Sequence, residues 1–174
     1  TAGISDRRKK RYYRNKPVRF GFLGNSSYYK GLKLLLDVAD SLYSCASPFS
    51  ISIFCQNPYG ERKYLHQNKP FSHDEADKVY DGFDVLVVPS ICEETFSLVV
   101  LEALSRAVPC IISDKVGAKD LLIETGGGSV YSDTNDLKDI LKRILDEPGL
   151  LEEWNQHIMS AHMELDYQKY AEKI

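Results

Sequence analysis

The chain has 174 residues, of which 43% are hydrophobic and 27% are charged, and its formal net charge is −3. This profile is typical of one soluble globular domain with a buried core. The sequence predicts no transmembrane helix, because no apolar stretch approaches the roughly 18 residues of a membrane span. It also predicts no signal peptide, because the first residues do not form a basic segment followed by an apolar one.

The charge is unevenly distributed along the chain. Residues 1–20 hold eight basic residues and one acidic residue, so this segment is +7 (8 − 1) and the remainder is −10 (14 − 24). The basic run 7–11 is compatible with a nucleic-acid-binding arm or with a solvated linker. We favour the linker because no basic face continues into the domain. The predicted organisation is an interdomain linker at 1–17 and a domain at 18–174.

The first half of the domain predicts alternating strands and helices. Residues 18–23 (VRFGFL) are apolar except for Arg19 and are followed by Gly24, which predicts a buried strand. Apolar residues at helical spacing follow from about Lys30, and the next apolar run predicts a strand at 51–55. Residues 64–66 predict a short third strand.

The second half continues the alternation. Ser72 and Glu75 have the spacing of a helix capping box. Residues 84–89 predict a strand that is apolar on both faces, and residues 96–106 predict a helix. The remaining predicted elements are strands at 108–112 and 129–131, and two or three helices after Asp136 that are separated by Gly149.

These elements predict an α/β fold with a doubly wound, Rossmann-like parallel sheet. Strands that are apolar on both faces and alternate with helices indicate a parallel sheet covered on both sides. Ligands of such folds bind beyond the carboxyl ends of the strands. We therefore expect a ligand site among the loops 24–30, 89–95 and 113–119.

An acidic residue in the apolar run 98–104 is the sharpest feature of the sequence. This helix is apolar nearly all round and should be buried, so the carboxylate of Glu102 needs a partner. One alternative is an ion pair with a basic side chain. The other is a carboxylate that accepts two hydroxyl groups of a ligand, as at a ribose.

A second acidic residue precedes the same helix. Glu93 and Glu94 can simply complement the positive end of the helix dipole. However, Glu94 and Glu102 form a Glu-x7-Glu pattern, and residues 95–97 between them provide backbone amides at a helix start, which suit phosphate. This combination fits a sugar diphosphate better than a structural core.

The loop 24–31 has a weaker signal. It matches neither Gly-x-Gly-x-x-Gly nor a P-loop. Gly24 allows the backbone close to a ligand, and Lys30 provides a point charge for phosphate. The alternative is an ordinary loop with a solvated lysine.

Together these motifs resemble the signature of the retaining "group 1" glycosyltransferases with the GT-B fold. The similarity is carried by residues 84–90 (DVLVVPS), 94–103 (ETFSLVVLEA), 108–114 (VPCIISD) and 116–117, and by Phe22-Leu23-Gly24 and Lys30-Gly31. It covers nearly the whole chain, from the linker-like Gly3-Ile4 to the C-terminal helices.

The resemblance implies the C-terminal, donor-binding half of a GT-B enzyme. The N-terminal acceptor domain would belong to the same parent protein, and the fragment alone would be inactive. The implied donor is a UDP-, GDP- or ADP-sugar, with no metal, no cofactor and no nucleic acid as a partner. Glu94 would act as the catalytic residue by contacting the transferred sugar. The implied donor-binding residues are Gly24, Asn25, Lys30, Phe96, Ser97, Leu98 and Glu102, where Glu102 would hold the ribose and Lys30 would act with the amides of residues 96–98 on the diphosphate.

Several positions depart from the family pattern. Asn25 stands where the family often has an arginine, and Ser97 stands where glycine is common. Ala118 and Asp120 stand where glycine and glutamate often occur. A non-catalytic nucleotide-sugar-binding subunit and a GT-B nucleotide-sugar epimerase therefore stay open as alternatives. The base, the sugar and the acceptor are not determined.

Three further expectations concern the rest of the chain. Four cysteines and four histidines show no metal-ligand spacing, so we expect no structural metal and small buried cysteines in a reducing, cytoplasmic compartment. Any membrane association would be peripheral and made through the parent protein. A C-terminal apolar stripe is expected to face either the domain core or the missing domain; it consists of Met163, Tyr167, Tyr170 and Ile174.

Overall fold

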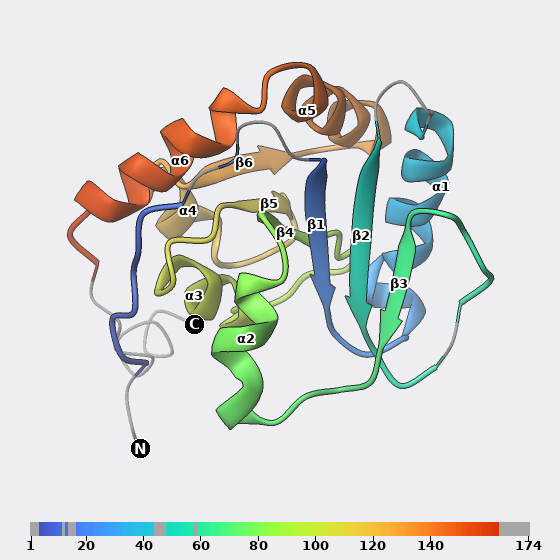
Figure 1. Cartoon of the computed structure of the whole chain (residues 1–174), viewed down its shortest axis with the longest axis horizontal. Coiled ribbons are helices and arrows are strands. Elements are labelled where there is room, and N and C mark those ends of the chain that lie inside the picture. The colour runs from blue at the N-terminus through green and yellow to red at the C-terminus, as the bar shows by residue number, and fades with distance from the viewer. Residues whose placement is uncertain (1–3, 12, 14–16, 44–47, 58, 164–174) are drawn as a thin grey trace.

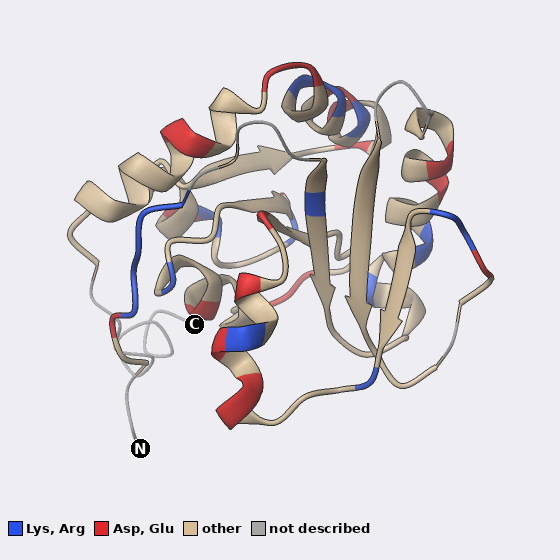
Figure 2. Ribbon diagram, viewed as in Figure 1, with Lys and Arg blue, Asp and Glu red and all other residues tan. Residues whose placement is uncertain are grey.

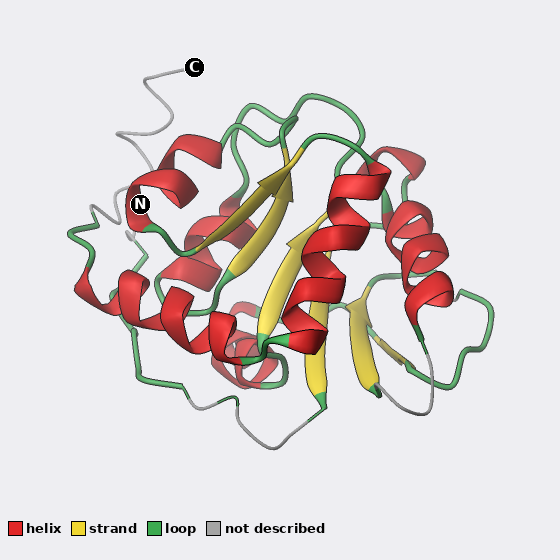
Figure 3. Ribbon diagram, turned by 90° about the horizontal axis from the view of Figure 1, so that it is seen from above, coloured by secondary structure: helices red, strands yellow, loops and turns green. Residues whose placement is uncertain are grey.

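The computed structural model describes residues 4–11, 13, 17–43, 48–57 and 59–163, and it has a parallel β-sheet with helices on both faces (Figures 1 and 3). The strands are β1 (Val18–Leu23), β2 (Phe49–Phe54), β3 (Leu65–Asn68), β4 (Val85–Val88), β5 (Cys110–Ser113) and β6 (Gly128–Tyr131). The α-helices are α1 (Leu32–Leu42), α2 (Ala76–Asp81), α3 (Leu98–Leu104), α4 (Lys119–Thr125), α5 (Thr134–Asp146) and α6 (Gly149–Ser160). Two short 3-10 turns, η1 (Tyr28–Lys30) and η2 (His73–Glu75), precede α1 and α2.

The sheet has the topology of a doubly wound fold. Its strand order is β3-β2-β1-β4-β5-β6, and every neighbouring pair is parallel. The order reverses between β1 and β4, and ligands of such sheets bind in the crevice at this reversal. The predicted fold class is therefore confirmed, and the loops after β1 and β4 lie at the point where a ligand is expected.

The core is divided into two layers by the sheet. Along β4, Val85 and Val87 belong to the layer beneath α1 and α5, while Leu86 and Val88 belong to the layer beneath α2, α3 and α4. Alternation of this kind follows from the two-residue period of a strand. It explains why β4 is apolar at every position and why all four of its residues are buried.

Most predicted elements are confirmed, with boundaries shifted by a few residues. The predicted capping box is present, because the Ser72 N–H donates to Glu75 Oε2 at 2.9 Å. The helix predicted at 96–106 is shorter, since Ser97 has extended backbone angles (φ −115°, ψ 103°) and Ala107 has a positive φ of 55°. Helix α4 was not predicted.

Most of the described N-terminal residues 4–11 are exposed, as expected for a solvated segment, but the segment also makes specific contacts with the domain. Arg8 Nη1 donates to the main-chain oxygens of Ile158 and Ala161 at 2.7 Å each. Arg11 is only 9% exposed and pairs with Asp81 of α2 at 2.9 Å. Figure 2 shows this basic segment in blue and the acidic residues of α2 in red. Whether residues 1–17 link two domains stays a prediction.

A buried asparagine attaches this segment to the domain. Asn155 of α6 is fully buried; its Nδ2 donates to the main-chain oxygen of Ala107 at 2.7 Å, and its Oδ1 accepts from the Arg11 N–H at 3.1 Å. Buried polar main-chain groups need such partners. Asn155 therefore provides hydrogen-bond partners for main-chain groups of two distant residues, Arg11 and Ala107.

The predicted C-terminal stripe lies mostly outside the described residues. Met163 is half-buried and packs against the core layer beneath α2, α3 and α4. Tyr167, Tyr170 and Ile174 lie beyond the described range, so the choice between core and interface stays a prediction. Over the part of the chain that the structure describes, no helix is both long and apolar enough to cross a membrane.

We expect Asn155→Ala to destabilise the fold by about 2–4 kcal/mol, because it leaves buried main-chain groups without partners. Urea denaturation of both proteins would measure this change. Asn135→Ala, on the exposed first turn of α5, is the matched control and should change the free energy of unfolding by less than ~0.5 kcal/mol. Equal stability of the two variants would show that the N-terminal segment is not fastened in this way.

Candidate functional site

Main-chain hydrogen bonds join the three loops that the sequence singled out. The Ile91 N–H donates to the Tyr29 oxygen at 2.9 Å, which connects the loop after β1 to the loop after β4. The Glu94 N–H donates to the Lys115 oxygen at 2.9 Å, and the Gly117 N–H donates to the Glu94 oxygen at 2.8 Å. Loops 24–30, 89–95 and 113–119 therefore form one surface at the carboxyl edge of the sheet.

Two glycines allow these loops to approach one another. Gly31 has φ +69°, and a Cβ there would lie 1.7 Å from the Pro89 oxygen. At Gly117 a Cβ would lie 2.0 Å from the Thr95 oxygen. Both contacts are with main-chain atoms that cannot move independently, so only glycine fits at these positions.

Lys30 and Glu94 meet at this surface. Lys30 Nζ lies 2.8 Å from Glu94 Oε1, and the two side chains are 35% and 16% exposed. The Ser90 hydroxyl also donates to Glu94 Oε1. The lysine is therefore not simply solvated, and the structure brings together two of the residues predicted for the site. Ser90 was not assigned a role from the sequence.

Glu102 is half-buried and has an uncharged partner. The Tyr80 hydroxyl of α2 donates to Glu102 Oε2 at 2.9 Å. Burial, followed by the effect of the Glu102 carboxylate, raises the pKa of Tyr80 well above its usual range. Tyr80 therefore stays protonated and acts as a donor at neutral pH. No sequence pattern indicated this partner, which lies 22 positions away in the chain.

Arg106, the basic residue that follows α3, has other partners than the Glu102 carboxylate. Arg106 follows Glu102 by one turn, but its Nε lies 2.8 Å from Asp77 and its guanidinium lies 5.0 Å above the Tyr80 ring. It donates to the main-chain oxygen of Glu102 at 3.0 Å, not to the carboxylate. Among the described residues Glu102 thus forms no ion pair, so the ion-pair alternative is not what the structure shows.

The start of α3 lies between the two glutamates. Leu98 is the first helical residue and is 48% exposed, whereas Ser97 is 4% exposed and Phe96 is half-buried against the core. No side chain of the described residues caps this helix. The first amides of a helix have no partner within it and carry partial positive charge.

A pocket of about 260 Å³ opens beside this surface. It lies at the carboxyl ends of β1 and β2 and is lined by Leu23, Gly24, Asn25, Phe54, Gln56, Pro70, Phe71 and Val99. Its lining combines rings and aliphatic groups with two amide side chains, which suits a flat polar heterocycle. Asn25 also shapes its own loop, because Asn25 Oδ1 accepts from the Ser27 N–H at 3.0 Å.

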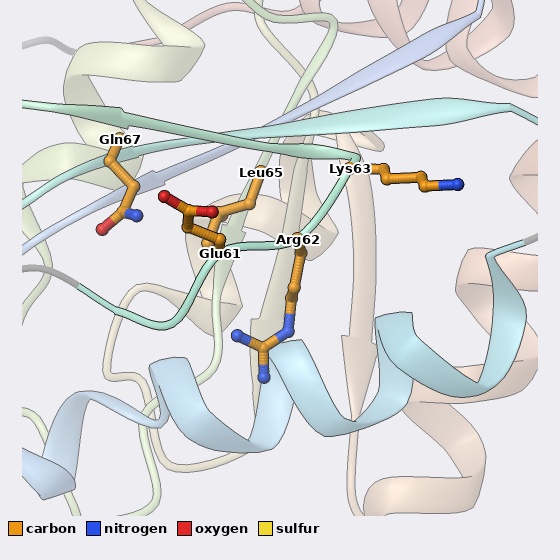
Figure 4. A pocket seen from close by; sticks show the side chains of 5 residues that line it. All are labelled: Glu61, Arg62, Lys63, Leu65 and Gln67. Carbon is orange, nitrogen blue, oxygen red and sulfur yellow. The ribbon is translucent and has the colours of Figure 1, made fainter.

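A larger depression lies along edge strand β3 (Figure 4). It is lined by Glu61, Arg62, Lys63, Leu65 and Gln67 and shares no residue with the three loops. Arg62 extends to α1, where its Nε pairs with Asp40 at 3.0 Å, and Lys63 points away from the other side chains (Figure 4). These groups do not converge, so we do not place the site there.

Cysteine and histidine side chains form no cluster in the described parts of the chain. No group of three His, Cys, Asp or Glu residues there has a geometry that could hold a metal ion. Cys55 and Cys110 are buried as expected, but Cys92 is exposed, because it lies in the surface loop after β4. Cys45 lies outside the described residues.

Comparison with protein families gives one match. A model of the family described as "Glycosyl transferases group 1" matches residues 17–147. No curated protein sequence matches the chain.

Three of the solved structures with the same fold are compared with the chain as follows. Sucrose-phosphate synthase from Thermosynechococcus elongatus is 18% identical, with a TM-score of 0.69 over 90% of this chain and 43% of that chain. WaaG, a glycosyltransferase involved in lipopolysaccharide biosynthesis, is 17% identical, with a TM-score of 0.73 over 84% and 42%. HepE from Anabaena, in complex with UDP-glucose, is 16% identical, with a TM-score of 0.73 over 90% and 48%. The chain therefore spans less than half of each.

We expect Gly117→Ala to destabilise the protein by about 1–3 kcal/mol, because the added Cβ must displace the Thr95 oxygen. Gly149→Ala is a matched control, since no atom lies within 4 Å of the Cβ at that position. Chemical denaturation would give both values. A Gly117→Ala protein as stable as the Gly149→Ala protein would show that the loops are not packed as described.

Proposed function

Because the chain belongs to the group 1 glycosyltransferases, we propose that it is the donor-binding domain of a retaining enzyme. The enzyme would move a sugar from a nucleotide diphosphate sugar to a glycan, lipid or protein acceptor. The observation that carries this proposal is the meeting of Lys30 and Glu94 at the carboxyl edge of the sheet, next to the helix that presents Glu102. The two glutamates flank the start of α3, where a diphosphate would lie.

The proposed diphosphate site combines a cation with helix amides. Lys30 would provide the positive charge, and the amides of residues 96–98 would donate to phosphate oxygens. The contact of Lys30 with Glu94 at 2.8 Å, in the loop that leads into α3, supports this assignment. We propose that these groups stabilise the leaving group without a metal ion.

The proposed nucleoside site uses the pocket and Glu102. The pocket beside Gly24 and Asn25 has the size and lining for a base, and Val99 of α3 forms one of its walls. Glu102 lies one turn further along the same helix, with a carboxylate that no cation of the described residues neutralises. A ribose between them would donate its hydroxyl groups to Glu102. The HepE structures with UDP and UDP-glucose show nucleotides bound by a protein of the same fold.

The proposed reaction proceeds with retention at the anomeric carbon. The bond between this carbon and the diphosphate oxygen breaks, and the acceptor oxygen forms its bond on the same face of the sugar. The proton of the acceptor hydroxyl passes to the departing phosphate oxygen, so charge and atoms balance. Glu94 would contact hydroxyl groups of the transferred sugar, and Lys30 would stabilise the negative charge of the diphosphate.

A non-catalytic nucleotide-sugar-binding subunit is a second candidate. It is favoured by Asn25, which stands where the family often has an arginine and supplies no second cation for the diphosphate. An epimerase with the GT-B fold is a third candidate. The acceptor domain would be supplied by the rest of the parent protein, and its chemistry would distinguish the three.

The first test is a thermal-shift screen of the chain with UDP-, GDP- and ADP-sugars. We expect one nucleotide series to stabilise the chain, because a ligand that binds only the folded state raises the midpoint of unfolding. The same preparation should transfer no sugar, since an acceptor must be held beside the donor. A chain that no nucleotide sugar stabilises would contradict donor binding, and appreciable transfer would contradict the need for a second domain.

The second test is Glu102→Gln. Nucleotide affinity should fall by about tenfold or more, because hydrogen bonds to a charged group contribute roughly 1.5–3 kcal/mol. Folding stability should be unchanged or slightly higher, because no described cation loses its partner. Calorimetric titration and a denaturation curve would measure both, with Glu124→Gln on the exposed face of α4 as the control. Lost stability with unchanged affinity would make Glu102 a structural residue.

A further inference from the structure

Two donors of different character bind the same oxygen of Glu94. Lys30 Nζ lies 2.8 Å from Oε1, and the Ser90 hydroxyl donates to Oε1 as well. In the described part of the chain, Oε2 accepts no hydrogen bond from protein. The carboxylate is therefore held on one side and is open on the other, where a ligand hydroxyl group could donate.

The two donors differ in how firmly they are held. Ser90 is 1% exposed and directly follows Pro89, at the end of the fully buried strand β4. Lys30 reaches Glu94 through a flexible four-carbon side chain that is 35% exposed. The serine can therefore hold one position while the lysine can change partners.

The main chain of Glu94 is fixed independently of both donors. It forms an isolated parallel bridge with Val116, and its N–H and oxygen bond to Lys115 and Gly117 at 2.9 and 2.8 Å. Only the side chain is left to be positioned. Its orientation therefore depends on Ser90 and Lys30.

A bound diphosphate would compete with Glu94 for Lys30. Two negative groups at this edge repel each other unless a cation lies between them, and the Asn25 loop offers none besides Lys30. As Lys30 turns toward the diphosphate, its hold on Glu94 weakens. Ser90 carries no charge, so it can keep its bond to Oε1 while this happens.

We propose that Ser90 is a positioning residue that keeps Glu94 oriented while Lys30 moves from Glu94 to the diphosphate. This inference rests on the proposed function, because it assumes a diphosphate sugar as the ligand. It assigns to Ser90 the task of presenting Oε2 to the transferred sugar. Loss of the serine hydroxyl should therefore affect binding of the sugar more than binding of the nucleoside diphosphate.

The first arm of the test needs no ligand. The Lys30→Ala variant removes the lysine from Glu94 and so mimics the state in which Lys30 has moved to the diphosphate. NMR relaxation of ¹³C-labelled glutamate then measures the mobility of the Glu94 side chain. We expect Glu94 to stay in one rotamer in Lys30→Ala and to exchange between rotamers in the Lys30→Ala, Ser90→Ala double variant. Equal mobility in the two proteins would overturn the proposal, because the Ser90 hydroxyl would then not hold Glu94 in the absence of Lys30.

The second arm compares each nucleotide sugar with its own diphosphate: UDP-glucose with UDP, GDP-glucose with GDP, and ADP-glucose with ADP. In Ser90→Ala we expect affinity for the sugar-bearing member of the bound pair to fall about tenfold, while affinity for the diphosphate changes less than about twofold. Ser90→Thr, which restores a hydroxyl, should recover the difference. Thr125→Val removes a different buried hydroxyl, that of Thr125 in α4, and should leave both affinities unchanged.

The outcomes separate the two claims. If Ser90→Ala weakens the sugar and the diphosphate equally, the role of Ser90 is structural and the positioning proposal is wrong. If wild type binds no member of any pair, the proposed function fails, and the relaxation arm still decides whether Ser90 positions Glu94.

Discussion

The parallel arrangement of the sheet determines where every residue of the candidate site lies. Since all strands run in one direction, their carboxyl ends share one edge, and the loops that follow them must meet there. The ladder extends beyond the strands themselves, because Glu94 and Val116 form a further parallel bridge in the loops. Gly31 and Gly117 then permit main-chain contacts that any side chain would block. The functional groups are thus positioned by the backbone.

The Glu102 carboxylate stays unpaired by a described cation because Arg106 pairs with a different carboxylate. Arg106 lies one turn beyond Glu102 and would be its natural partner on an isolated helix. Asp77 of α2 binds Arg106 at 2.8 Å, and Tyr80 occupies the space beside the Glu102 carboxylate. A neutral donor lowers the cost of burying this carboxylate without cancelling its charge. The result is an acidic group that keeps its capacity to accept hydrogen bonds.

The strands and the fold class could be predicted because their signal is local. A run such as 85–88, apolar on both faces, is consistent with few arrangements other than a buried parallel strand. The Glu-x7-Glu spacing likewise predicted one glutamate before the start of the helix and one within it. Tyr80 and Ser90 could not be assigned roles, since their importance arises only from contacts made in the folded chain. Helix α4 is short and mixed in character, and its pattern was too weak to recognise.

The contacts of the N-terminal segment could not be predicted for the same physical reason. Arg7 and Arg11 pair with Asp77 and Asp81 of α2, each 70 positions further along the chain. Local charge density cannot reveal pairing over such separations. The burial of Arg11 to 9% exposure depends on these distant carboxylates and on Asn155.

The same segment is hydrogen-bonded to the C-cap of α3, the helix that carries Glu102. The Arg7 N–H donates to the Ser105 oxygen at 2.7 Å, and its guanidinium shares Asp77 with Arg106. Ser105 and Arg106 in turn donate to the main-chain oxygen of Glu102 at 2.8 and 3.0 Å. A displacement of the N-terminal segment would therefore pull on the main chain at the carboxyl end of α3, one turn from the Glu102 carboxylate.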